Sequence, residues 1–403
     1  MQEQTMAHQF DDFSLEILMK NRAWSFGNLD TKAVVSPRLT LRSGGHLQDY
    51  SHPNENAWRV KAGAVEFLNQ DGAVSTRFDR ISENDGKYTM EGRFRLGGTG
   101  ETHYLQDCGE IARPLNRTAL VVPIHDAYFM YGINLLYQSV GSDYDIVFVF
   151  STDADRRAFA TMHQPSASLY YHAIVLDDHF TGGAISVVAD RKTWPTVKKF
   201  LALSLVHKSY DYILCVDAET FILRPTGWTA AAEQVVSQAR WYAGLLTQKH
   251  AAERNIMHAS SMALSPHAEH ADIQAISRNW GFYSWWWDIP VYAAGSVSGF
   301  LNWMEWDTSL QFVERFAHNL YDHITYQFYM GLHGGFSFVP VEGIAHSLEF
   351  KPAAMVGRVH REINPVRWAN AFAYAQDPDF FRENDYLAIY HIDRKSFPQF
   401  ELA

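Results

Sequence analysis

From Thr118 onward, short and almost wholly apolar runs alternate with segments of helical spacing. Residues 118–124 and 144–150 read TALVVPI and YDIVFVF, and a third run is followed by acids in HAIVLDD. Runs without apolar–polar alternation are typical of strands whose two faces are both covered, as in a parallel sheet between helices. This pattern predicts an α/β fold for residues 116–403, with a Rossmann-type, mostly parallel sheet and flanking helices.

Residues 1–115 have a different pattern. In KYTMEGRFRL, apolar side chains such as Met90 and Phe94 share one face, while Glu91 and Arg93 share the other. The dipeptide Asp71-Gly72 between two β-type runs indicates a hairpin. We expect a small antiparallel β domain here, of meander or sandwich type. The sequence leaves open whether it binds glycan, mediates assembly or braces the rest of the chain.

Composition narrows the classes of partner and compartment. The chain has 403 residues and a formal net charge of −11, without a basic stripe, which disfavours a nucleic-acid partner. Its two cysteines fit neither a disulfide framework nor a zinc site, and Cys215 lies in an apolar run that suits a core position. No secretory signal pattern and no membrane-spanning apolar window is present. A cytoplasmic protein is therefore expected.

The acidic tip of one apolar run carries the strongest chemical indication. In YDYILCVDAETFIL, residues 210–223, the run ends in Asp217 and Glu219, and a second apolar run follows. Two residues apart on an extended chain, the carboxylates project to the same side. Carboxylates so placed suit Mn²⁺ or Mg²⁺ holding a diphosphate. Neither a GxxxxGK[ST] nor a GxGxxG loop occurs, which disfavours P-loop and Rossmann dinucleotide chemistry.

The stretch YDYILCVDAETFIL resembles the metal-binding segment of GT-A-fold glycosyltransferases, as an Asp-x-Glu variant of Asp-x-Asp. The order of other pieces is similar too: TALVVPIH and YDIVFVFSTDAD resemble the nucleotide-binding strands, and SVSGFLNW resembles the acceptor segment. YHIDRKSFP resembles the C-terminal His and Lys of retaining members, although it lacks the usual glycine. The resemblance implies a GT-A-like sheet and transfer of a sugar from a nucleotide-diphosphate sugar to a hydroxyl of a glycan or glycoconjugate.

The resemblance also implies roles for individual residues. The metal ligands would be Asp217, Glu219 and His391. One of Lys198 and Lys199 would face the donor diphosphate, and the other would be solvated. Asp153 would accept from the base or ribose, or alternatively cap a helix. The nucleotide-sugar site as a whole would comprise Pro123, His125, Asp153, Lys198, Lys199, Asp217 and Lys395.

Three acids are candidates for catalysis on the acceptor side. Asp288, in WWWDIP, lies among aromatic side chains that suit a sugar ring, and it would be a general base for an acceptor hydroxyl or a cap in an aromatic core. Asp322 and Glu342 are the alternatives. An inverting reaction needs such a base, whereas the His/Lys resemblance favours a retaining one.

Two other functions stay open. A sugar-phosphate nucleotidyltransferase would share the sheet and the acids, but PIHDAYFMYG lacks the Gly-rich basic loop expected after the first strand. A non-catalytic carbohydrate-binding protein would suit the β domain and the 12 Trp, 20 Tyr and 26 Phe. For the transferase we expect a UDP-sugar donor, polysaccharide biosynthesis, and peripheral membrane contact through a lipid-linked acceptor. Homo-oligomerisation is left open.

Overall fold

A computed structural model describes most of the first half of the chain and selected segments of the second half. The described residues are 10–98, 100–111, 115–163, 169–180, 194–218, 220–222, 226–245, 260–262, 264, 269–279, 282–283, 291–309, 312, 321–340, 366–371 and 388–392. The chain divides into two compact units. The first comprises Met1–Leu115 and Thr152–Asp178, and the second comprises Asn116–Ser151 and His179–Ala403. The predicted role of residues 1–115 as an accessory domain stays a prediction.

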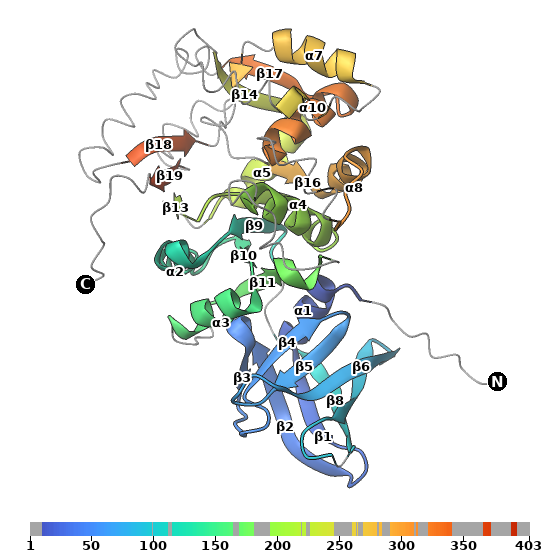
Figure 1. Cartoon of the computed structure of the whole chain (residues 1–403). Helices are drawn as coiled ribbons and strands as arrows, with labels where there is room; N and C mark the ends of the chain where they lie inside the picture. Colours follow the sequence, from blue (N-terminus) through green and yellow to red (C-terminus); the bar gives the residue numbers. More distant parts are fainter. Residues whose placement is uncertain are drawn as a thin grey trace, which may run out of the picture. The chain divides into compact units, whose positions relative to one another are not determined.

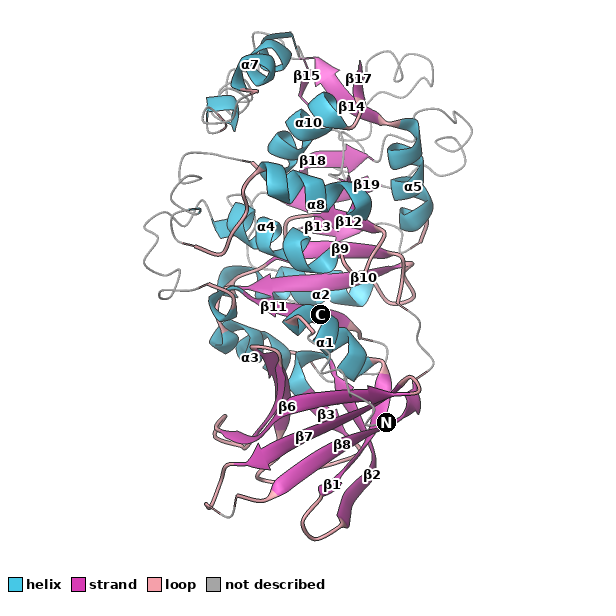
Figure 2. Cartoon of the chain, turned by 90° about the vertical axis from the view of Figure 1, so that its right-hand side faces the viewer, coloured by secondary structure: helices cyan, strands magenta, loops and turns pink. Residues whose placement is uncertain are grey.

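The first unit is built on a closed antiparallel barrel (Figures 1 and 2). Each strand pairs with its neighbour in sequence, and β1 also pairs with β8, which closes the barrel. The barrel follows helix α1 (Asp12–Lys20) and consists of β1 (Arg22–Asn28), β2 (Ala33–Arg42), β3 (His46–Gln48), β4 (Ala57–Lys61), β5 (Ala64–Leu68), β6 (Val74–Asn84), β7 (Lys87–Phe94) and β8 (Thr102–Glu110).

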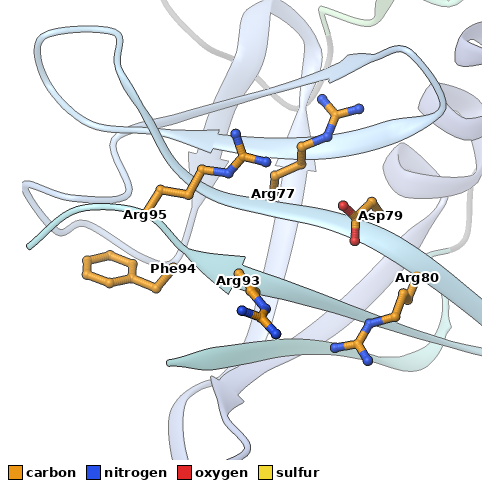
Figure 3. Close-up of a pocket in the computed structure, with 6 residues that line it drawn as sticks. All are labelled: Arg77, Asp79, Arg80, Arg93, Phe94 and Arg95. Atoms are coloured by element: carbon orange, nitrogen blue, oxygen red, sulfur yellow. The ribbon is translucent and has the colours of Figure 1, made fainter. Parts of the chain in front are cut away.

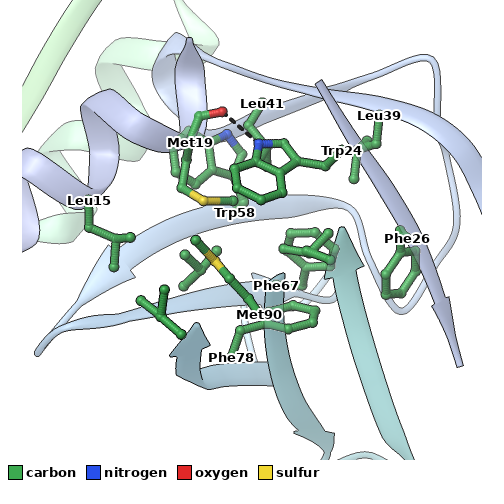
Figure 4. Packing of buried hydrophobic residues seen from close by; sticks show 13 residues of the cluster. Leu15, Met19, Trp24, Phe26, Leu39, Leu41, Trp58, Phe67, Phe78 and Met90 are labelled. Carbon is green, nitrogen blue, oxygen red and sulfur yellow. Dashed lines mark hydrogen bonds between the residues drawn. The ribbon is translucent and has the colours of Figure 1, made fainter. Parts of the chain in front are cut away.

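The barrel encloses a core of apolar and aromatic side chains (Figure 4). Phe26, Phe67 and Phe78 contact one another edge to face, with ring centroids 5.1–6.4 Å apart. Helix α1 covers one end and adds Met19, whose carbonyl accepts a hydrogen bond from the Trp24 indole at 3.0 Å. Edge-to-face aromatic pairs stabilise beyond their buried area, so this core contributes to the stability of the barrel.

The predicted hairpin, the alternation in β7 and the antiparallel meander are confirmed, but the sandwich alternative is wrong, because the meander closes into a barrel. Gly72 adopts a left-handed φ of +79° in the turn between β5 and β6, and Met90 is buried in the barrel. Closure depends on the pairing of Trp24 with Asp107 and its neighbours, which is a long-range register. Local alternation does not encode such a pairing, and this is why the closure was missed.

A later segment of the chain completes the first unit. It contains α3 (Asp153–Thr161), β11 (Tyr171–Val175) and a short 3-10 turn, Leu176–Asp178. The Tyr171 carbonyl accepts from the Lys20 ammonium at 2.6 Å and from the Ser43 hydroxyl at 2.7 Å. These buried contacts join the segment to α1 and to the 3-10 turn after β2.

The second unit holds a mixed sheet in the order β10-β9-β12-β16. β9 (Thr118–Pro123) is parallel to β10 (Tyr144–Phe150) and to β12 (Tyr212–Cys215), whereas β16 (Val291–Ala293) is antiparallel to β12. Helix α4 (Trp194–Val206) packs against β9, β10 and β12. The strands β9 and β10 are buried throughout and β12 nearly so, as their apolar runs predict.

Two smaller sheets are also mixed or antiparallel. In β13-β19-β18 the pairs are antiparallel, and in β15-β14-β17 only the β14–β17 pair is parallel. The other elements of the unit are α2 (Phe129–Gln138), β13 (Thr220–Ile222), α5 (Trp228–Gln238), β14 (Arg240–Leu245), α7 (His270–Asn279), β15 (Phe282–Tyr283), α8 (Ala294–Trp303), α10 (Asp322–His333), β17 (Ser337–Pro340), β18 (Val366–Ala371) and β19 (Ala388–Ile392).

The prediction of a mostly parallel, Rossmann-type, GT-A-like sheet is therefore wrong. The barrel is antiparallel, and the sheet of the second unit is mixed because β16 runs against β12. β16 has three residues, too few for a periodicity to show in the sequence. Within the described residues, no helix is both long and apolar enough to cross a membrane.

Candidate functional site

The candidate site lies at the carboxyl ends of the three parallel strands in the second unit. β9 is flanked by β10 on one side and by β12 on the other, so the strands that follow β9 in the chain lie on opposite sides of it. In open α/β sheets, ligands bind outside the carboxyl ends of the strands where the strand order reverses in this way. The polar residues after β9 and β12 are therefore the ones to inspect.

Asp217 follows β12 at this edge. The parallel ladder continues to Val216, whose N–H donates to the Val121 carbonyl at 3.0 Å. Asp217 then leaves the sheet, and its carbonyl accepts from Thr220 N–H at 3.2 Å, which turns the chain toward β13. Its side chain is 34% exposed. The strand end thus fixes the position of Asp217 while its side chain stays partly exposed.

Lys199 links Asp217 to a second, buried carboxylate. Its ammonium lies 3.4 Å from Asp217 Oδ1 and 3.8 Å from Asp322 Oδ1, and its side chain is 11% exposed. Asp322 is the first residue of α10, where the helix dipole favours a negative charge. The other oxygen of Asp322 accepts from the Tyr292 hydroxyl at 2.5 Å. We call Lys199, Asp217, Asp322 and Tyr292 the edge cluster.

Burial and charge act in opposite directions on the lysine of the edge cluster. Burial alone would lower the pKa of Lys199, but Asp217 and then Asp322 outweigh it and hold the pKa above its ordinary value. Burial raises the pKa of the Tyr292 hydroxyl well above its usual range, and Asp322 adds to the effect. Lys199 is consequently a fixed cation, and Tyr292 a permanent hydrogen-bond donor.

Asp322 is held in place by both of its oxygens. It is buried, with Lys199 facing one oxygen and Tyr292 bonded to the other. The structure thus places this predicted catalytic acid in a buried ion pair behind Lys199, and its catalytic role stays a prediction. The adjacent His323 is also buried, and burial lowers its pKa to about 4, so it is neutral near neutral pH.

Lys198 contacts the end of β9. Its buried ammonium donates to the Ile124 carbonyl at 2.6 Å, directly after Pro123. The His125 ring is partly exposed and contacts the Tyr128 ring edge to face, with centroids 4.4 Å apart. Two successive lysines of α4 thus contact the ends of neighbouring strands. Lys198 donates to the backbone after β9, and Lys199 pairs with the acid after β12.

Asp153 lies in the first unit, at the start of α3. Its carboxylate is 2.8 Å from Arg156, 3.1 Å from Arg59 and 3.3 Å from Arg157. Burial would raise its pKa, but these arginines, Arg156 foremost, hold the pKa below its ordinary value. Thr152, and not Asp153, caps the helix. Asp153 is therefore part of an arginine network, and its predicted contact with a nucleoside stays a prediction.

The remaining predicted residues are described only in part. Glu219, Asp288, Glu342 and Lys395 lie outside the described residues. For His391 only the backbone is described, and the β13–β19 register places it directly opposite Thr220. The C-terminal histidine is thereby brought to the strand that follows Asp217, although the two are far apart in sequence.

The described residues do not complete a metal site by themselves. Among them, no group of three His, Cys, Asp or Glu side chains has the geometry to hold a metal ion. Asp217 supplies one partly exposed carboxylate of the predicted set. The predicted Mn²⁺ or Mg²⁺ site is therefore carried forward as a proposal.

Two members of this region were not anticipated from the sequence. Tyr292 lies in the three-residue strand β16, and His323 follows Asp322 on α10. The polar pair Asp322-His323 at the head of an otherwise apolar helical segment was the available signal. Both side chains are buried, and a buried polar pair needs partners from elsewhere in the fold.

Comparisons with known proteins give little. No family model matches the chain, and no curated protein matches it. Among solved structures, the chain is similar to the apo structure of the bifunctional glycosyltransferase WbbM, with 11% identity and a TM-score of 0.29. The match covers 54% of this chain and 41% of that one. A likeness this remote carries no conclusion about this protein's fold or activity.

Proposed function

We propose that this protein is a glycosyltransferase that moves a sugar from a nucleotide-diphosphate sugar, a UDP-sugar above all, to a hydroxyl of a glycan or glycoconjugate. The observation that carries the proposal is the position of Asp217. Its partly exposed carboxylate ends β12 at the strand-order reversal, where α/β sheets bind their ligands. A fixed cation, Lys199, lies 3.4 Å behind it.

Charge balance explains why a carboxylate would be useful at a diphosphate site. A carboxylate alone repels a diphosphate, so the two meet through a divalent cation, which prefers oxygen ligands from carboxylates and phosphates. Asp217, Glu219 and His391 would hold that cation, and the β13–β19 register brings the backbone of His391 opposite Thr220, three residues after Asp217 in the chain. When bound, Mn²⁺ or Mg²⁺ would neutralise charge on the departing nucleoside diphosphate.

Lys199 would act on the site through Asp217. Its ammonium faces one oxygen of Asp217, Asp322 faces the lysine in turn, and Tyr292 holds Asp322. A catalytic group held in this way is preorganised, so it does not have to reorient when the donor binds. Asp322 would therefore be a positioning residue.

The acceptor would lie near α8, the helix formed by the segment that resembles the acceptor side. Trp303 ends this helix, and its indole donates to Glu269 at 2.6 Å. The His333 ring lies 3.2 Å from the same carboxylate oxygen. Aromatic rings beside an anchored carboxylate suit the apolar face and the hydroxyls of a sugar.

A thermal-shift screen of nucleotide sugars with and without Mn²⁺ tests the proposal, because a ligand that binds the folded state raises its melting temperature. We expect one donor to stabilise the protein only with Mn²⁺, and Asp217→Asn to abolish that shift. Asp211→Asn is the matched control, since Asp211 precedes β12, is exposed and pairs with Arg117 at 2.6 Å.

Identification of the reaction products separates the three candidate functions. Release of nucleoside diphosphate with a glycosylated acceptor supports the transferase. Release of pyrophosphate from a nucleoside triphosphate and a sugar phosphate would instead indicate a nucleotidyltransferase. Glycan binding without any nucleotide binding would indicate a carbohydrate-binding protein.

A further inference from the structure

The outer wall of the barrel contains a pocket that belongs to no part of the edge cluster. It has a volume of about 470 Å³ and lies on β6 and β7 of the first unit (Figure 3). Its lining is dominated by the guanidinium groups of four arginines. The lining residues are Arg77, Asp79, Arg80, Arg93, Phe94 and Arg95. In a chain with a net charge of −11, this is a marked local concentration of positive charge.

The β6–β7 pairing brings arginines together, and their repulsion lowers the stability of the fold. Arg77 and Arg93 are direct cross-strand partners in the β6–β7 ladder, and like charges placed so are destabilising. The register shifts between Phe78 and Arg80, which makes Asp79 the extra residue of a β-bulge. Bulges often re-aim side chains beside binding sites.

Only glycine fits opposite this bulge. A Cβ at Gly92, the partner of Phe78, would lie 2.2 Å from the Arg77 carbonyl oxygen. The close approach of the two strands therefore depends on Gly92. Backbone, bulge and side chains together make the pocket a built feature of the barrel.

Two of the four arginines are engaged by the protein. Arg77 donates to Glu66 at 2.5 Å and to the Ala62 carbonyl at 3.2 Å, and Arg80 lies 3.2 Å from Glu91. Glu66 also accepts from Arg59, which continues the network to Asp153. Arg77 is thus a lining residue whose guanidinium is held in place by the protein.

The other two guanidiniums are available to a ligand. Arg93 and Arg95 are exposed, and neither forms an ion pair with any residue that the structure describes. Phe94 lies between them in the chain but on the other face of the strand, where its partly buried ring contacts His103 with centroids 5.1 Å apart. Two available cations in one pocket match a ligand that carries an oxyanion.

We propose that this pocket binds an acidic saccharide, with its carboxylate, phosphate or sulfate oxygens on Arg93 and Arg95. The oxyanion part of the proposal stands on the arginines alone, whereas the saccharide part rests on the proposed transferase function. A nucleic acid fits less well, because its binders carry an extended basic face and this charge is confined to a pocket.

Isothermal titration with three probes tests the site: trigalacturonic acid, glucose 6-phosphate and neutral maltotriose. We expect the two acidic probes to bind and maltotriose not to bind. The acidic probe with the higher affinity identifies the preferred oxyanion. In Arg93→Gln/Arg95→Gln the affinity should fall at least about tenfold, as expected for the loss of charged hydrogen bonds.

Arg38→Gln is the matched control, because Arg38 is an exposed arginine on β2 outside the pocket. It should change the affinity by less than about twofold, as surface substitutions elsewhere do. Binding should also weaken as salt is added, since exposed charges are screened.

Three results would overturn the proposal: maltotriose binding as tightly as the acidic probes, undiminished binding of the acidic probes in the double variant, or tighter binding of a single-stranded oligonucleotide that the double variant loses. Asp217→Asn should bind the acidic probes like the unmodified protein. If the proposed metal-dependent donor site at Asp217 is disproved, binding of the acidic probes should be unaffected. The two proposals can therefore be tested independently.

Discussion

The interior of the barrel and the edge of the sheet in the second unit differ in the kinds of side chain that they bury. Inside the barrel, an apolar cluster runs from Leu15 to Leu105, and the buried His103 beside Phe26 is hydrogen-bonded to Thr76 at 2.9 Å. At the edge of the second unit, a lysine, an aspartate and a histidine are buried or nearly so. Removing charges from water is costly unless each has a partner, so such a group persists where its position serves a purpose. The difference contrasts a core that stabilises the barrel by apolar packing with an edge at which buried charged groups are held by their partners.

The largest effect is expected from a cavity in the barrel. Phe67 is fully buried and contacts Phe26 and Phe78. Phe67→Ala should lower the free energy of unfolding by about 4 kcal/mol, through lost burial and the cavity left behind. Urea unfolding followed by circular dichroism measures this, with Phe67→Leu as the milder control. A cost below about 1 kcal/mol would mean that the barrel does not depend on its aromatic core.

A slightly smaller effect is expected from the lysine of the edge cluster. Lys199→Met leaves Asp322 buried with Tyr292 but without its cation. Breaking a buried pair in this way should cost about 3 kcal/mol of unfolding free energy. Lys208→Met, at an exposed lysine soon after α4, is the control and should cost less than about 0.5 kcal/mol. Equal losses in the two variants would contradict the distinction between barrel interior and edge cluster.

The third effect is a pH dependence of the unfolding free energy, expected from His323 beside the edge cluster. Burial lowers the pKa of His323 from 6.5 to about 4, so the unfolded chain binds its proton more readily than the folded protein does. The stability is fully present above the unfolded pKa and is lost as the pH falls from about 6.5 toward 4.

Between about pH 7 and about pH 5, His323 should remove roughly 2 kcal/mol of unfolding free energy. Urea unfolding at both values, in the unmodified protein and in His323→Phe, measures the contribution as the difference in pH dependence. An identical pH dependence in both proteins would show that His323 is not held neutral by burial.

Much of the local structure could be predicted from the sequence. The buried strands β9 and β10 and the helices α2 and α4 match apolar runs or helical spacing, and the hairpin at Asp71-Gly72 follows from its turn residues. Closure of the barrel and the direction of β16 could not be predicted. Both depend on pairings between distant segments, such as Trp24 with Asp107 and Leu214 with Val291.

The site could be predicted only in outline. Asp217 after an apolar strand and Lys199 on the preceding helix were singled out, and the structure brings them together. Their connection to Asp322 and Tyr292 was not foreseen, because these residues come from α10 and β16 and share no local pattern with Asp217.

Calorimetric titration with the nucleoside diphosphates UDP and GDP tests the central claim most directly. The account predicts that the unmodified protein and Asp211→Asn bind one of them in the presence of Mn²⁺ and at least about tenfold more weakly without it. Asp217→Asn should lose this metal-dependent gain. Binding that is independent of Mn²⁺, or fully retained in Asp217→Asn, would contradict the claim that Asp217 joins a metal ion to the donor diphosphate.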